Sequence, residues 1–188
     1  MRWVYAAATV LIILLAVGIL FSRRAEAPSP VSMNLTLTSS TFEPNGLIPS
    51  KFTCDGANVS PELSISGVPA SAKTFALIMD DPDIPESVKQ SRGIEKFDHW
   101  VVFNIPPDTR EVPEGVEPVG TPGNNGRGAV GYTGPCPPDR EHRYFFKLYA
   151  LDAALDLPAG ASKVEVERAM EGHVIGRTEL VGRYDRKR

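Results

Sequence analysis

Three long apolar segments constrain the fold of this chain more than any other feature. They cover residues 74–79 (TFALIM), 100–103 (WVVF) and 144–151 (YFFKLYAL), and proline, glycine or charged residues stand near their ends. Runs of this length are typical of β-strands that are covered on both faces. Shorter segments, at residues 35–38 and 63–66, alternate apolar and polar side chains as half-buried strands do. Because 16 glycines and 17 prolines supply turns, the sequence predicts a mainly β fold, arranged as a sandwich.

The N-terminal segment has a different character. Residues 3–21 form a 19-residue apolar stretch without a charged side chain. As a helix it would be about 28 Å long, close to the ~30 Å hydrocarbon core of a bilayer. A cleaved signal peptide is the alternative, because residues 25–27 (AEA) have the small-x-small pattern of a cleavage site. Arg23 and Arg24 precede that pattern and Pro28 would follow the cut, which favours an uncleaved transmembrane helix.

Three regions are therefore expected. Residues 1–24 are a membrane anchor or a signal segment, residues 25–33 are a linker, and residues 34–188 are the β domain. We expect the protein to be membrane-anchored through residues 3–21, with its domain outside the cytoplasm. Charge does not settle the orientation of the anchor, because basic groups stand on both sides of it.

The charge balance excludes one class of partner. Residues 1–24 hold three of the 20 basic residues and no acidic residue, so 17 basic residues face 23 acidic residues in the remainder, a net charge of −6. Nucleic-acid binding depends on neutralising phosphates with basic side chains. We therefore expect no nucleic acid among the partners.

Two cysteines, Cys54 and Cys136, lie in turn-rich loops and form no CxxC motif. A zinc site is not expected from this pattern. In an oxidising compartment the two cysteines are candidates for a disulfide, and two unpaired thiols are the alternative. The sequence leaves both states open.

Polar side chains stand at the ends of the predicted central strands. Asp81 and Asp83 follow the first strand in the segment DPDIP, which ends at Pro85; His99 directly precedes the second strand, and His142 stands just before the third apolar segment. Two imidazoles and two carboxylates converge if these strands are adjacent and antiparallel. Imidazole donates hydrogen bonds to phosphate or carboxylate oxygens, and more strongly when it is protonated. Each residue alone is more often structural, but together they predict a small anion pocket, with the His142 ring at its rim.

Two neighbouring segments extend this prediction. Tyr144 lies two residues after His142 and points to the same face of the strand. The loop GPCPP begins with Gly134 and Pro135, and glycine lets a backbone N–H approach an anion closely. The alternative is a proline-stiffened loop that holds a cysteine. The glycine-rich stretch at residues 116–132 is either a binding element or a surface excursion.

One helix is predicted near the C-terminus. Residues 162–165 (SKVE) fit a capping box, in which a serine and a glutamate satisfy each other's backbone N–H groups. Gly172 can adopt the left-handed conformation that ends a helix.

Signatures of catalysis are absent from the sequence. There is no G-x-S-x-G elbow, no H-E-x-x-H motif and no metal-spaced Cys/His cluster. A Cys136–His142 nucleophile and a metal site from two histidines and two carboxylates stay as formal alternatives. We expect no catalytic residue, no metal, no cofactor and no enzymatic activity.

Linked motifs across residues 34–185 resemble the phosphatidylethanolamine-binding protein family, and most closely its prokaryotic, Raf kinase inhibitor-like branch. The resembling segments are FTCDGANVSP at residues 52–61, DPDIP at 81–85, DHWVVFNIP at 98–106, GPCPP at 134–138 and HRYFFKLYALD at 142–152. The resemblance implies a sandwich of antiparallel sheets with a C-terminal α-helix.

It also implies a binding function without catalysis. The implied ligand-binding residues, carried over by motif, are Asp81, Asp83, Pro85, His99, Gly134, Pro135, His142 and Tyr144. The implied ligand is a small phosphorylated or carboxylated anion. The alternative is an inhibitor of a kinase or hydrolase that acts on a protein target, and an enzyme on the same scaffold is a third hypothesis. Asp98 stands where eukaryotic members often carry another histidine, so kinase inhibition is not carried over.

Overall fold

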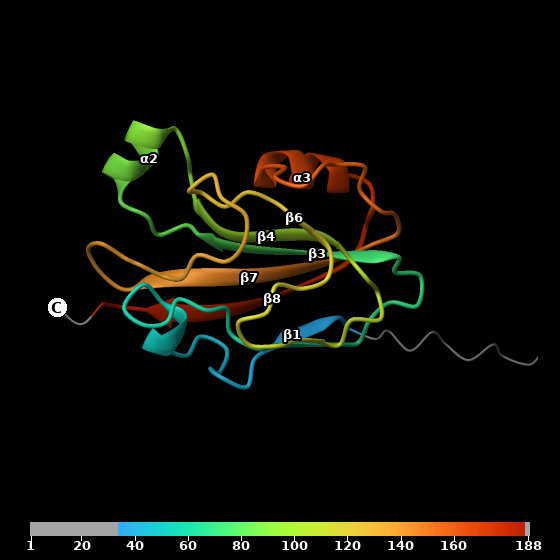
Figure 1. Ribbon diagram of the computed structural model, residues 1–188, viewed down its shortest axis with the longest axis horizontal. Helices are drawn as coiled ribbons and strands as arrows, with labels where there is room; N and C mark the ends of the chain where they lie inside the picture. The colour runs from blue at the N-terminus through green and yellow to red at the C-terminus, as the bar shows by residue number, and fades with distance from the viewer. Residues whose placement is uncertain (1–33, 187–188) are drawn as a thin grey trace, which may run out of the picture. The chain divides into compact units, whose positions relative to one another are not determined.

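Two antiparallel sheets form the domain, which a computed structural model describes over residues 34–186 (Figure 1). The smaller sheet has the order β1-β2-β5, from β1 (Thr36–Thr38), β2 (Leu63–Ser66) and β5 (Glu111–Val112). The larger sheet has the order β6-β4-β3-β7-β8, from β6 (Thr121–Pro122), β4 (Phe97–Ile105), β3 (Thr74–Asp81), β7 (His142–Leu151) and β8 (Val174–Tyr184). The three apolar segments of the sequence therefore form the three central strands.

Helices are few and short. Residues 34–186 contain a 3₁₀ turn, η1 (Ser50–Phe52), and two α-helices, α2 (Glu86–Arg92) and α3 (Lys163–Met170). The capping box of α3 is confirmed, because the Ser162 side chain accepts from the Glu165 backbone N–H and the Glu165 carboxylate accepts from the Ser162 backbone N–H. The predicted fold class needs a correction here. The fold is mainly β with two α-helices, of which α2 was not expected.

A second correction concerns the membrane. Residues 34–186 contain no helix that is long and apolar enough to cross a bilayer. This finding overturns the fold class with a transmembrane helix and the membrane-anchored localisation that were expected from residues 3–21. That segment lies outside the described residues.

Apolar side chains pack in two clusters, one on each face of the larger sheet. One fills the space between the two sheets and includes Phe75, Leu77 and Met79 of β3. The other includes Ala76 and Ile78 of β3 and packs against α3, which lies along β4 and β6 in Figure 1. Burial of both faces explains why β3 reads as a continuous apolar run instead of an alternating one.

Candidate functional site

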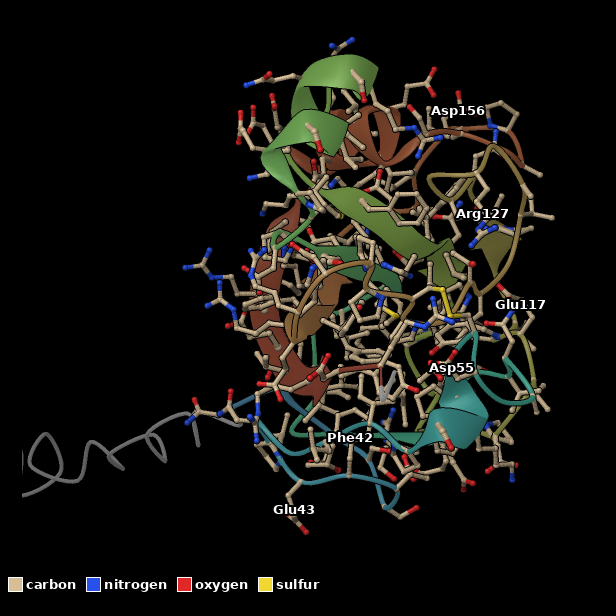
Figure 2. The ribbon with its side chains drawn as sticks, turned by 90° about the vertical axis from the view of Figure 1, so that its left-hand side faces the viewer. Phe42, Glu43, Asp55, Glu117, Arg127 and Asp156 are labelled. Atoms are coloured by element: carbon tan, nitrogen blue, oxygen red, sulfur yellow. A yellow bond between two sulfur atoms is a disulfide. The ribbon has the colours of Figure 1, made fainter. Side chains whose placement is uncertain are left out.

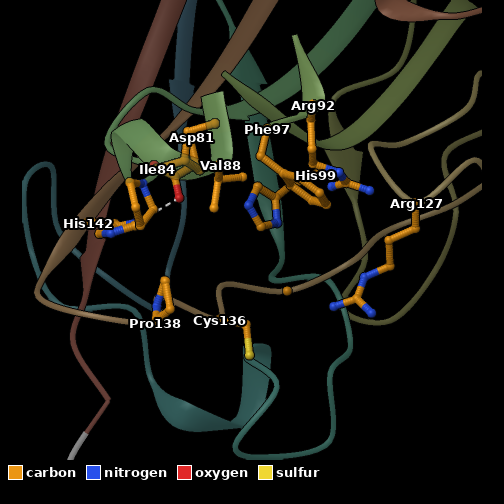
Figure 3. A pocket seen from close by; sticks show the side chains of 12 residues that line it. Asp81, Ile84, Val88, Arg92, Phe97, His99, Arg127, Cys136, Pro138 and His142 are labelled. Atoms are coloured by element: carbon orange, nitrogen blue, oxygen red, sulfur yellow. Dashed lines mark hydrogen bonds and ion pairs between the residues drawn. The ribbon is translucent and has the colours of Figure 1, made fainter. Parts of the chain in front are cut away.

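The end of β3 meets the beginnings of two neighbouring strands. β3 pairs antiparallel with β4, where Asp81 is opposite Phe97, and with β7, where Asp80 is opposite Phe145. Antiparallel pairing brings the last residue of one strand beside the first residues of its neighbours. Asp81, His99 and His142 consequently line one cavity of about 190 Å³ (Figure 3). Pockets for drug-sized ligands measure about 300–1,000 Å³, so this cavity suits a smaller molecule or ion.

A β-bulge directs His99 toward this cavity. The pairing of β3 with β4 passes from Met79↔Trp100 to Asp80↔Asp98 and skips His99. An extra residue of this kind breaks the strict alternation of side chains along a strand. The His99 ring accordingly lies edge-on to the ring of Tyr144, which belongs to the core between the sheets, with 5.2 Å between the ring centres.

Hydrogen bonding determines the form of the His99 ring. Its Nδ1 lies 2.6 Å from the backbone oxygen of Thr133. A carbonyl oxygen can only accept, so Nδ1 carries a hydrogen and donates it. Burial lowers the pKa of His99, although the hydrogen bond to Thr133 and the charge of Asp81 act in the opposite direction. The ring is therefore neutral near pH 7, and Nε2 is left as an acceptor.

His142 lies between two carboxylates. Its Nδ1 donates to Asp81 Oδ2 at 2.7 Å, and its Nε2 donates to Asp139 Oδ1 at 2.8 Å. Ionised carboxylates only accept, so both ring nitrogens must carry a hydrogen and the ring is an imidazolium. Burial disfavours this charge, but the bonds to Asp81 and Asp139 outweigh burial and raise the pKa of His142. The side chain is 0% exposed, so the expectation that it stands at the rim is wrong.

Two arginines that the sequence prediction missed also line the cavity. Arg92 is in the last turn of α2, and Arg127 is in the glycine-rich loop before β7. Figure 3 shows both guanidinium groups on the His99 side of the cavity, away from His142. Within residues 34–186, neither guanidinium has a carboxylate partner, whereas four other arginines do: Arg140, Arg143, Arg183 and Arg186. The Arg92 guanidinium lies 5.7 Å from the centre of the Phe97 ring, a cation–π contact that orients it.

The loop that carries Arg127 packs closely on β4. The Gly126 N–H donates to the Asp98 backbone oxygen at 2.7 Å. A Cβ at Gly126 would come within 2.8 Å of the Phe97 ring, so this close approach requires glycine. The Arg127 N–H donates to the Asn125 side chain, which fixes the start of the turn. The glycine-rich stretch therefore brings Arg127 to the cavity.

A disulfide fixes the opposite wall. Cys54 and Cys136 are joined, with their Cα atoms 5.4 Å apart, and Figure 2 draws this bond in yellow near Asp55. Gly134 lines the cavity, but its N–H donates to Asn58 Oδ1 at 2.8 Å. That N–H is therefore already used within the protein, contrary to the role expected for it. The Pro135 oxygen accepts from the Cys54 N–H, which holds the two loops together.

The predicted site residues divide into two groups. Those that line the cavity are Asp81, Pro85, His99, Gly134 and His142. The Asp83 carboxylate instead binds the Arg143 side chain, at 2.7 Å from both Nε and Nη2. Tyr144 is fully buried behind the two histidine rings. Asp83, Tyr144 and Pro135 therefore support the cavity from outside its lining.

Charge is distributed unevenly around the cavity. One side has His142 with its two carboxylate partners, which together carry one negative charge. The other side has the neutral His99 ring with two unpaired guanidinium groups. No group of three or more side chains in residues 34–186 has the arrangement of a metal site. The arginine side is the part of the cavity that suits an anion.

Comparison with known proteins gives a consistent assignment. A family model described as phosphatidylethanolamine-binding protein matches residues 38–185. The UPF0098 protein of Methanothermobacter thermautotrophicus is 51% identical over 158 residues, which cover 81% of this chain and 99% of that protein. The UPF0098 protein of Chlamydia trachomatis is 42% identical over 152 residues, with coverages of 81% and 99%.

Solved structures agree with these matches. The phosphatidylethanolamine-binding protein homolog CT736 from Chlamydia trachomatis superposes with a TM-score of 0.79 at 41% identity, and covers 83% of this chain and 100% of that chain. YbcL of E. coli superposes with a TM-score of 0.73 at 29% identity, with coverages of 82% and 99%. The resemblance inferred from the sequence motifs is confirmed, and the chain belongs to the phosphatidylethanolamine-binding protein family.

Proposed function

We propose that this protein is a non-catalytic binding module whose cavity takes one small phosphate-bearing anion. The observation that carries this proposal is that Arg92 and Arg127, which form no ion pair with a carboxylate of residues 34–186, line a cavity of about 190 Å³ together with His99. Guanidinium groups bind phosphate oxygens in a bidentate manner. A cavity of this size holds inorganic phosphate or the phosphate end of a head group, but not a large metabolite.

Binding of the anion next to His99 requires a proton between the two. The neutral His99 ring offers an acceptor at Nε2, which repels a fully deprotonated phosphate oxygen. A bound phosphate therefore shares one proton with this nitrogen, whether the ligand or the ring brings it. The second pKa of a phosphate monoester is about 6. The complex consequently holds one more proton than its free components above about pH 7.

This proton gives the first prediction. We expect the Kd for phosphoethanolamine to rise by up to tenfold for each pH unit between about pH 7 and 8.5. The titratable groups around the cavity, besides His99, are His142, Asp81 and Asp139, and the two arginines Arg92 and Arg127 face it as well. Isothermal titration calorimetry in buffers of different ionisation enthalpy measures the protons taken up. A Kd that does not change with pH would contradict the role given to His99.

Matched variants test the arginine contact. Arg127→Gln should weaken binding of phosphate and phosphoethanolamine by roughly tenfold or more, the effect of one charge-assisted hydrogen bond. Arg110→Gln is the control, since Arg110 is exposed, donates to the backbone oxygens of Pro107 and Thr109, and does not line the cavity. Equal losses in the two variants, or no saturable binding by the wild type, would overturn the proposal.

The same experiment separates the alternative functions. A binding module returns phosphoethanolamine unchanged, whereas an enzyme releases products that chromatography detects. An inhibitor of a kinase or hydrolase would require a protein target, and its contact surface need not include Arg127. Phosphoethanolamine that is recovered unchanged, together with binding that depends on Arg127, therefore favours the proposed function over both alternatives.

A further inference from the structure

The side chain of Asp139 occupies one hydrogen-bond donor of His142, a residue that lines the cavity. Its Oδ1 accepts from His142 Nε2 at 2.8 Å, while Asp81 takes the other ring nitrogen. Both donors of the only imidazolium beside the cavity are thus engaged within the described part of the chain. Asp81 is 3% exposed and belongs to the end of β3, whereas the Asp139 side chain is 39% exposed and comes from a loop. Of the two carboxylates, only that of Asp139 is exposed enough to turn away from His142 into solvent.

We propose that Asp139 is an internal competitor for the anion site, and that a bound phosphate replaces its carboxylate on His142 Nε2. This inference rests on the proposed function and adds a regulatory residue to it. In the free protein the carboxylate keeps the buried imidazolium neutralised. In the complex a phosphate oxygen takes over that role.

The surrounding contacts permit this exchange without movement of the whole loop. The loop is fixed at one end by the Cys54–Cys136 disulfide and at the other by the ion pair between Glu141 and Arg183. Between these two points, rotation about the side-chain bonds of Asp139 is enough to release His142.

A neighbouring arginine can hold the released carboxylate. Arg140 already donates to Asp139 Oδ2 at 2.7 Å, and its other terminal nitrogen donates to the Asp83 backbone oxygen at 3.1 Å. The Arg140 side chain is 59% exposed, so the Asp139 carboxylate keeps a cationic partner at the surface after it leaves the imidazolium. The Asp139 carboxylate is therefore still paired with a cation after phosphate has displaced it.

The test is the order of phosphate affinities in a short series of full-length variants. Asp139→Asn keeps the shape and an acceptor oxygen but removes the charge, and Asp139→Ala removes the acceptor as well. The inference predicts that affinity for inorganic phosphate rises from wild type to Asn to Ala, by roughly tenfold over the series. Glu141→Gln is the control, since it removes one negative charge from the same loop, keeps an acceptor oxygen for Arg183 and has no contact to His142.

The opposite order would overturn the inference. If Asp139 only holds the loop in place, its removal disorders the wall of the cavity and the affinity falls from wild type to Ala. An equal gain in affinity in Asp139→Asn and Glu141→Gln would also overturn it, since an equal gain reports the loss of one negative charge and not competition for His142.

If wild type and variants all fail to bind phosphate, the proposed function fails together with the inference. Wild-type binding that Asp139→Asn leaves unchanged refutes the inference alone. Thermal unfolding of each variant shows that it is folded.

Discussion

At the scale of single residues, the site depends on the different states of two histidines. His99 donates from Nδ1 to a backbone carbonyl and is neutral, whereas His142 donates from both nitrogens to carboxylates and is charged. Nothing in the two positions of the sequence distinguishes these states, because each histidine stands near the beginning of an apolar segment. The partners that decide the charge come from other parts of the chain: Thr133 for His99, and Asp81 and Asp139 for His142.

The charge of His142 makes a prediction about stability. Its pKa is raised in the folded protein, so the folded state binds the proton more tightly than the unfolded state does. The stabilisation is complete below the unfolded pKa of about 6.5 and is lost as the pH rises through the folded pKa. We therefore compare the free energy of unfolding of wild type with that of His142→Asn. We expect the difference between the two proteins to decrease as the pH rises from 6.5 through the folded pKa of His142.

Urea denaturation at a series of pH values measures this difference. His142→Asn is expected to be less stable than wild type at pH 6, because the ring is fully buried and two carboxylates lose a cationic partner. The gap between the two proteins should narrow toward alkaline pH. Parallel pH profiles would show that His142 is not charged in the folded protein.

At the scale of secondary-structure elements, the burial of each strand or helix determines whether its sequence pattern could predict it. β3 and the central part of β4 were predicted because both of their faces are buried and their side chains there are apolar. β7 was predicted because residues 144–151 are almost wholly apolar, although its second face is only half-buried. The helix α3 was predicted from its capping box. The helix α2 has no buried residue and therefore no apolar period, which is why it and its Arg92 were missed.

The bulge in β4 could not be predicted for a related reason. It depends on how β4 pairs with β3, and that register is a property of two strands and not of one. Strict alternation would place His99 on the face of the sheet opposite to Trp100. The strand-end positions of Asp81, His99 and His142 were therefore sufficient to predict a shared site, but not the direction of the His99 ring.

The disulfide between two loops is the element with the most direct effect on stability. Cys54 and Cys136 are 82 residues apart in the sequence, so the bond restricts a long loop in the unfolded chain. Replacing both cysteines by serine should lower the free energy of unfolding by about 2–5 kcal/mol. The midpoint of urea denaturation under non-reducing conditions measures this. A midpoint equal to that of wild type would mean that the bond contributes nothing.

The same variant is also informative about the site. Cys136 lines the cavity, and the disulfide fixes the loop that carries Asp139. We expect phosphate affinity to fall in the double serine variant even at temperatures where it is fully folded. Unchanged affinity would show that the hydrogen bond from Cys54 to Pro135 and that from Gly134 to Asn58 hold this wall without the disulfide.

At the scale of the whole molecule, the fold brings six separate parts of the chain to one cavity. Lining residues come from the end of β3, the helix α2, the start of β4, the glycine-rich loop, the loop before β7 and the start of β7. The family and the mainly β fold could be predicted from linked motifs, whereas the two arginines could not, because each lies on a connecting segment whose position the central strands do not determine. The site is consequently a property of the tertiary arrangement.

A crystal structure of the protein with inorganic phosphate tests the central claim most directly. We expect one phosphate in the cavity, with oxygens about 3 Å from His99 Nε2 and from the Arg127 guanidinium. The Asp139 carboxylate should be turned away from His142 Nε2 in that complex. An empty cavity at a phosphate concentration that saturates calorimetric binding, with phosphate bound elsewhere on the domain, would contradict the claim that this cavity is an anion site.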